Sequence, residues 1–81
     1  MLLHIVTPEG TAFTGEADAV QLPGIDGLFQ ILNNHAPLIS ALKEGTVKVE
    51  KDNTKQLFQI KSGIVEVLNN KISVLTEGVV R

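Results

Sequence analysis

The clearest structural signal in this sequence is Thr46-Val47-Lys48-Val49-Glu50-Lys51, in which apolar and charged side chains alternate. Successive side chains of an extended strand point to opposite faces, so the valines share one side and the charged groups share the other. This pattern predicts a strand with one buried and one solvent-exposed face. The same alternation recurs in Val65-Glu66-Val67 and in Lys71-Ile72-Ser73-Val74.

Segments with a similar pattern fill most of the chain. Leu3 and Ile5 bracket His4, which is therefore expected to point outward. Lys51–Lys55 reads as a hairpin loop, and Asn69-Asn70 suits a type I′ turn because Asn tolerates positive φ. We expect strands at residues 2–7, 16–22, 28–32, 37–42, 45–51, 55–61, 63–68 and 71–76. About eight short strands at this spacing predict an all-β fold, a small β-sandwich or flattened barrel of mostly antiparallel strands, in a single domain over residues 1–81.

Two segments are less regular. Leu38, Ile39 and Leu42 lie at helical spacing, and Pro37 could be the first residue of a helix. The segment is short for a helix, so we prefer a strand and keep a helix as the alternative. Residues 77–81 are expected to be the frayed end of the last strand.

Composition excludes several classes of protein. The chain has 81 residues, of which 43% are hydrophobic and 20% charged, with a net charge of -2 and no cysteine. These values are typical of a soluble globular domain, and they exclude a disulfide scaffold and a thiolate metal site. No apolar run reaches the ~20 residues of a membrane span, and no signal-like segment begins the chain. The basic residues are scattered, which argues against nucleic acid as a partner.

The residues that could carry chemistry do not form a recognisable pattern. His4 and His35 are far apart in sequence and show no metal-ligand spacing, and the carboxylates are dispersed. Gly24-Ile25-Asp26-Gly27 lacks the spacing of a phosphate-binding loop. We therefore expect neither an enzyme nor a cofactor. A small barrel that binds a metal through its histidines remains an alternative, which metal analysis of the purified protein would decide.

Two expected loop tips carry unusual residues. Ile25, Leu28 and Phe29 lie beside a glycine-rich turn, here called the glycine tip (residues 24–29), where polar residues would be usual. These side chains either complete the core and cover an edge or form an apolar contact patch. Asn33-Asn34-His35-Ala36-Pro37, here called the HAP tip, combines turn formers with a proline that favours extended geometry before it. This tip suits a recognition surface or an ordinary turn.

These residues resemble a known family. Gly27-Leu28-Phe29-Gln30-Ile31-Leu32-Asn33-Asn34-His35-Ala36-Pro37-Leu38 is similar to the pattern G-x-[LF]-x-[IV]-x-x-x-H-A-P-L of the epsilon subunit of rotary F-type ATP synthases. Ser62–Val67 resembles that family's G-G-[IF]-[LV]-E-V, and Asn70–Leu75 resembles its N-x-[VI]-T-V-L. Gly45–Val49, Ile5–Glu9 and Phe13–Glu16 also fit. The resemblance covers essentially the whole chain. The elements His35–Leu38 and Gly63–Val67, found together at this separation, are fairly specific for the family.

The resemblance implies a ten-stranded β-sandwich and a non-catalytic role. Epsilon subunits belong to the central stalk, where they are held by the gamma subunit and rest on the ring of c subunits. The chain would then help to couple rotation driven by protons or sodium ions to ATP synthesis. It would lie at the cytoplasmic face of the bacterial inner membrane and contact the membrane only through the complex.

The resemblance also assigns contact residues. The c-ring contact carries over to residues of the glycine tip: Asp26, Gly27, Leu28 and Phe29. The gamma contact carries over to the end of the first strand, to the HAP tip and to the residues just beyond it: Thr7, His35, Ala36, Pro37 and Ser40.

The sequence departs from the family in two respects. The position after Gly27 is often glutamate in epsilon subunits, whereas here it is Leu28, so this contact is expected to be apolar or to be made by neighbours such as Asp26. Most members continue into two helices, whereas this chain ends at Arg81. We expect either a naturally short member or a chain cut at the domain boundary. The rival interpretation is a free-standing sandwich that binds peptides or sugars, but three phenylalanines without Trp or Tyr make a poor aromatic platform.

Overall fold

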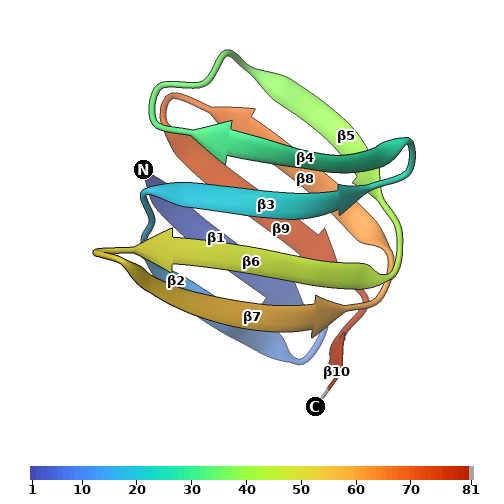
Figure 1. Cartoon of the computed structure of the whole chain (residues 1–81). Coiled ribbons are helices and arrows are strands. Elements are labelled where there is room, and N and C mark those ends of the chain that lie inside the picture. The colour runs from blue at the N-terminus through green and yellow to red at the C-terminus, as the bar shows by residue number, and fades with distance from the viewer. Residues whose placement is uncertain (81) are drawn as a thin grey trace.

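A computed structural model describes residues 1–80 and contains ten strands within that range. Figure 1 labels the strands along the chain. Their bounds are β1 (Leu2–Thr7), β2 (Gly10–Glu16), β3 (Ala19–Gly24), β4 (Gly27–Leu32), β5 (Leu38–Leu42), β6 (Gly45–Lys51), β7 (Thr54–Ile60), β8 (Gly63–Leu68), β9 (Lys71–Thr76) and β10 (Val79–Val80). The all-β prediction is confirmed, and the ten strands match the number that the resemblance implies. The segment at residues 37–42, for which a helix was the alternative, forms strand β5.

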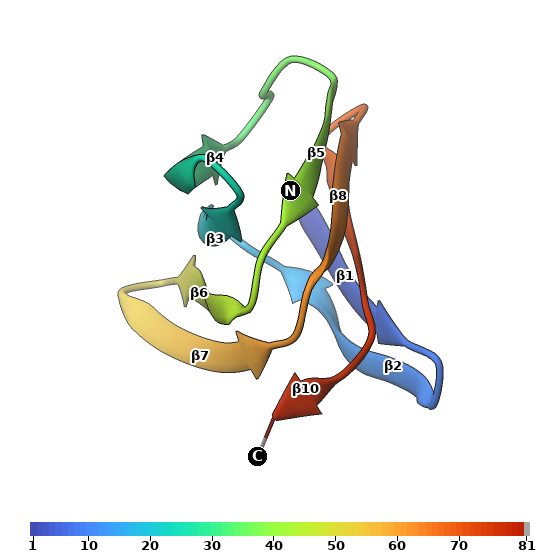
Figure 2. The ribbon, with the colours of Figure 1, turned by 90° about the vertical axis from the view of Figure 1, so that its right-hand side faces the viewer.

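The strands form two layers. Their order is β10-β7-β6-β3-β5-β8-β9-β1-β2, and within residues 1–80 β4 pairs with β3 alone. Figure 2 shows the layers nearly edge-on, with β3, β4, β6 and β7 in one and β5, β8 and β1 in the other. A single register pair, Gly24 with Leu42, joins β3 to β5. All these pairings are antiparallel except that of β1 with β9, which is parallel.

The core lies between the layers and is built by the predicted alternation. Val47, Val65 and Val74 are fully buried, whereas Glu66 is exposed. Leu3 and Ile5 are also fully buried, so His4 lies on the outer face as expected. At one side Phe13 of β2 and Phe58 of β7 meet edge-to-face, with ring centroids 5.3 Å apart. Within residues 1–80 every fully buried side-chain nitrogen or oxygen has a hydrogen-bond partner.

The two predicted hairpin turns have the backbone that type I′ requires. Asn69 and Asn70 have φ of 51° and 60°, and Asp52 and Asn53 have φ of 51° and 62°. The Asp52 amide donates to a carboxylate oxygen of Asp18 at 3.0 Å. This hydrogen bond, with help from Lys51, holds the pKa of Asp18 below its ordinary value. The contact therefore stabilises the turn above the ordinary carboxyl pKa and is lost as the pH falls through the lowered one.

The strand expected at residues 16–22 is wrong, because the chain changes layers within it. β2 ends at Glu16 and β3 begins at Ala19. Between them the Ala17 amide donates to the Met1 carbonyl at 2.8 Å, and the Asp18 amide donates to the Glu50 carbonyl at 2.7 Å. The two amides thus bond to different layers. The strand expected at residues 55–61 is shifted by one residue, to Thr54–Ile60.

The C-terminal segment is not a frayed end of β9. Val79 and Val80 form the separate strand β10, which pairs antiparallel with Ile60 and Gln59 of β7. Arg81, also part of that expectation, lies outside the described residues. The β9–β10 junction returns the chain from one layer to the other, and the Thr76 hydroxyl lies at its centre.

Candidate functional site

The glycine tip is the hairpin turn between β3 and β4. Gly27 has φ of 130°, a conformation that side chains other than glycine rarely adopt. Ile25 and Leu28 are 60% and 66% exposed, whereas Phe29 turns inward and packs against the core. Asp26 is also exposed. Of the residues expected at the c-ring, the structure therefore gathers Asp26, Gly27 and Leu28 at an apolar tip and directs Phe29 into the sandwich.

Backbone contacts hold the glycine tip in place. The Ile25 amide donates to the Ala41 carbonyl at 3.3 Å, and the Lys43 amide donates to the Pro23 carbonyl at 2.9 Å. A side chain on Gly24 would come within 2.8 Å of the Phe29 ring. The exposed leucine and isoleucine are therefore presented by a fixed loop.

The HAP tip is fastened at its base. The Met1 amino group donates to Asn33 Oδ1 at 2.6 Å, and the Asn34 amide donates to Asn70 Oδ1 at 2.8 Å. Asn34 itself has φ of 63°. Beyond this base the side chains of the predicted contact residues are exposed: His35, Ala36 and Pro37. His35 Nδ1 lies 2.6 Å from the Ala36 carbonyl oxygen, so the imidazole edge carrying Nε2 remains available for a partner.

Thr7 and Ser40 lie away from the HAP tip. The register aligns Leu38 with Val67 and Leu42 with Gly63, which places Thr7 and the HAP tip at opposite ends of the strands. The Thr7 hydroxyl accepts from the Glu9 amide and donates to the Gly10 carbonyl, each at 3.1 Å. Ser40 is half-buried and, with Ala41, lines a hollow of about 370 Å³ beside the glycine tip. The five residues expected at gamma thus occupy three separate places.

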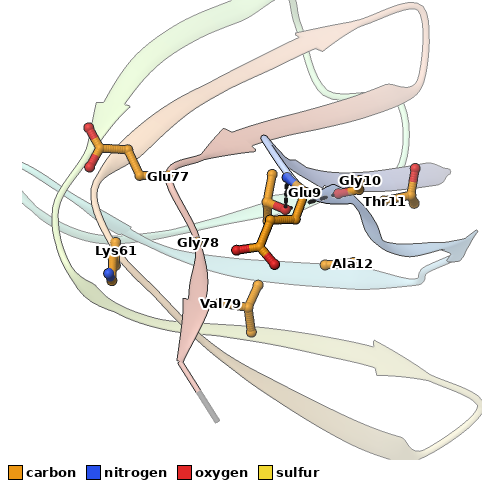
Figure 3. A pocket seen from close by; sticks show the side chains of 9 residues that line it. Glu9, Gly10, Thr11, Ala12, Lys61, Glu77, Gly78 and Val79 are labelled. Atoms are coloured by element: carbon orange, nitrogen blue, oxygen red, sulfur yellow. Dashed lines mark hydrogen bonds between the residues drawn. The ribbon is translucent and has the colours of Figure 1, made fainter.

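A second hollow, of about 320 Å³, lies where β10 passes the β1–β2 turn (Figure 3). Glu9 and Val79 approach each other there, whereas Lys61 and Glu77 lie on the other side of the β10 ribbon. Its carboxylates do not converge. Within residues 1–80 no group of three histidines, cysteines or carboxylates is arranged to hold a metal ion. The described part of the chain also contains no helix capable of spanning a bilayer.

The outer face of the β5–β8–β9–β1 layer was missed by sequence reasoning. Ile39, Ile64, Leu68 and Leu75 are exposed there. The signal was present in Gly63–Leu68, where Ile64 and Leu68 alternate with the buried Val65 and Val67 and make both faces of the strand apolar. An apolar outer face is a feature of contact surfaces.

The fold and its tips define a small β-sandwich domain with fixed, partly apolar loops. Residues 1–81 match the family model described as the β-sandwich domain of the ATP synthase delta/epsilon chain, and the chain belongs to this family. It is 50% identical over 78 residues to the ATP synthase epsilon chain of Chlorobium limicola, covering 95% of this chain and 89% of that one. Against the epsilon chain of Helicobacter pylori strain P12 the identity is 38%, with 96% and 63% covered.

Solved structures share the fold. One chain of the mitochondrial ATP synthase of Euglena gracilis, solved as OSCP, F1 and c-ring in a rotational state, superposes with a TM-score of 0.92 at 19% identity. The match covers 99% of this chain and 52% of that one. A chain of the central stalk and c-ring of the Tetrahymena thermophila enzyme gives a TM-score of 0.84 at 16% identity. The family resemblance expected from the sequence is confirmed, and at these identities the structural matches concern the fold alone.

Proposed function

We propose that this chain is a non-catalytic central-stalk subunit of an F-type ATP synthase. It binds gamma and the c-ring and helps to couple ion-driven rotation to ATP synthesis. The observation that carries the proposal is the match along the whole chain to the delta/epsilon β-sandwich family, together with 50% identity to a named epsilon chain. In such a complex the chain lies at the cytoplasmic face of a bacterial membrane and reaches the lipid only through its partners.

The fold supports a mechanical role. A rotor element that links two partners has to resist deformation, because any yielding would dissipate torque. Here two layers pack on one apolar core, and backbone hydrogen bonds at both ends of β3 tie the layers together. Close-packed interiors have low compressibility and transmit strain. The sandwich therefore serves as a stiff spacer between the partners.

Binding to gamma is the first test of this proposal. The chain and the cognate gamma subunit are mixed at micromolar concentration and separated by size exclusion. Co-elution at a one-to-one ratio is expected. Separate elution of the two folded proteins would contradict a stalk role.

The glycine tip provides the proposed c-ring contact. Leu28→Asp is expected to weaken docking on the membrane sector at least tenfold, because it places a charge in the contact centred on Ile25 and Leu28. The fold should remain intact, since this side chain is 66% exposed. Co-sedimentation of the reconstituted complex with membranes measures the effect. Leu57→Asp on β7, where the leucine is 64% exposed, is the control; equal retention of both variants would count against the contact.

The HAP tip provides part of the proposed gamma contact. His35→Ala is expected to weaken gamma binding by a few-fold to a hundred-fold, because the variant loses an exposed imidazole on a fastened loop. Titration of gamma, followed by calorimetry, gives the dissociation constant. Lys55→Ala on the exposed side of β7 should bind like the wild type. If His35→Ala also binds like the wild type, the imidazole is not part of the contact.

A further inference from the structure

The glycine tip contains one pair of residues in which a free carboxylate precedes a glycine. Of the eight aspartates and asparagines in the sequence, Asp26 alone is followed by glycine. Asp26 is exposed, and within residues 1–80 its carboxylate has neither a hydrogen bond nor an ion pair. A Cβ atom placed on Gly27 would meet no heavy atom within 4 Å beyond its chain neighbours. The space beside this pair is therefore open.

An exposed Asp–Gly pair can rearrange without an enzyme. The glycine nitrogen attacks the side-chain carboxyl carbon of the aspartate, and the amide proton leaves with the carboxyl hydroxyl as water. The product is a five-membered succinimide ring. Water then adds to one of the two ring carbonyls and breaks its bond to the glycine nitrogen. One opening restores aspartate, and the other gives isoaspartate, whose main chain runs through the former side chain. One water is lost and one regained, so no oxidant or reductant is needed.

The other aspartates and asparagines are less suited to this reaction. Asp18 accepts a hydrogen bond from the Asp52 amide at 3.0 Å and lies 3.5 Å from Lys51 Nζ. Asn33 and Asn70 each accept a hydrogen bond through Oδ1, at 2.6 and 2.8 Å. All seven are followed by a residue that carries a Cβ atom, which crowds the nitrogen that would have to attack. The chemistry is therefore expected to concentrate at one position.

We infer that Asp26 is a site of isoaspartate formation in the folded, unassembled chain. The product would be a substrate for the class of methyltransferases that recognise isoaspartyl carboxylates. Such an enzyme transfers a methyl group from S-adenosylmethionine to the carboxylate that the rearrangement frees. The ester then loses methanol and closes to the same succinimide, which can reopen to aspartate. The inference goes beyond the proposed function, since it concerns the covalent state of the tip before any partner is bound.

The rearrangement would change the shape of the glycine tip. Gly24 and Gly27 are register partners, so only two residues connect them. Isoaspartate adds one main-chain atom to this connection. Gly24 has no room to move, because a Cβ there would lie 2.8 Å from both the Gly27 carbonyl oxygen and the Phe29 ring. The added length is therefore expected to displace Gly27 and the exposed Leu28, while the formal charge stays the same.

Ageing of the full chain tests the inference. The folded protein is kept for several weeks in neutral buffer, and a purified isoaspartyl methyltransferase then transfers labelled methyl groups from S-adenosylmethionine. Electron-transfer fragmentation of the tryptic peptide that ends at Lys43 locates the isoaspartate. We expect more of it at Asp26 than at all other positions together. Asp26→Glu keeps the charge but would have to close a six-membered ring, so its labelling should be lower by about tenfold or more. Asp18→Glu is the matched control and should be labelled like the wild type.

The outcomes are distinct. Labelling at Asp26 that is lost in Asp26→Glu supports the inference. An aged folded chain without label, while a chain aged in urea is labelled, would show that the turn holds the carboxyl group away from the Gly27 nitrogen and would overturn it. Label found mainly at another residue would also overturn it. None of these measurements involves gamma or the c-ring, so failure of the inference leaves the proposed function intact.

Discussion

Gly63→Ala is expected to reduce the free energy of unfolding by about 3 kcal/mol or more, a large share of the stability of so small a domain. A Cβ atom at this position would overlap the carbonyl oxygen of Leu75 and lie 3.0 Å from Thr76 Cα. Both obstacles are backbone atoms of β9, which is paired with β8 on one side and β1 on the other. The backbone therefore cannot withdraw without breaking its ladder hydrogen bonds.

Urea denaturation followed by circular dichroism measures this loss as a shift of the midpoint. Gly78→Ala is the matched control, because a Cβ there meets only the Lys61 side chain at 3.8 Å, an ordinary contact. It should change stability by less than about 1 kcal/mol. A Gly63→Ala protein as stable as Gly78→Ala would show that β8 and β9 do not approach so closely.

Thr76→Val is expected to cost about 2 to 3 kcal/mol although it conserves the shape of the side chain. The buried Thr76 hydroxyl lies 3.0 Å from the carbonyl oxygens of Lys61 and Ser62 and 3.2 Å from that of Gly78. It also lies 3.4 Å from the Gly78 amide, from which it accepts. Valine would leave these polar groups facing a methyl group at the junction between the two layers.

Thermal unfolding of Thr76→Val tests this expectation as a lower Tm. Thr46→Val is a suitable control, because its hydroxyl bonds to the exposed Gln59 side chain on the surface, where water replaces the lost partner. Its stability should lie within about 0.5 kcal/mol of the wild type. Equal Tm values for the two variants would show that the buried hydroxyl is dispensable.

Local pattern was sufficient for most of the sandwich. Strands with a buried face, such as β6 and β8, are predictable from the sequence because alternate positions hold the branched apolar residues that the core requires. The Asn69-Asn70 turn was predictable because positive φ restricts the choice of residues. These features depend on neighbours within a few residues.

The elements that were missed depend on distant partners. β2 is an edge strand in which Phe13 is the principal apolar side chain packed on the core, so alternation is weak. β10 has two residues and exists because β7 pairs with it. The break after Glu16 follows from hydrogen bonds of Ala17 and Asp18 to opposite parts of the chain. None of these contacts produces a periodic pattern of apolar and polar residues in the sequence.

In the candidate site, too, features set by nearby residues were predictable, whereas features set by distant contacts were not. The glycine tip was recognisable from apolar residues beside glycines. The anchoring of the HAP tip was not, because Asn33 and Asn34 find their partners at Met1 and Asn70. The apolar outer face of the β5–β8–β9–β1 layer was also not recognisable, since its exposed side chains come from three strands and only the register brings them together.

The parallel pairing of β1 with β9 has a consequence for biosynthesis. During synthesis β1 finds this neighbour only when residues 71–76 have emerged from the ribosome. Until then one long edge of β1 has no partner, and the apolar side chains of Leu3 and Ile5 lack the opposing part of their core. Topologies dominated by such remote pairings fold slowly and expose strand edges while they wait. The nascent chain is therefore expected to complete this sandwich only after residues 71–76 have left the ribosome, when it would benefit from prompt capture by its assembly partners.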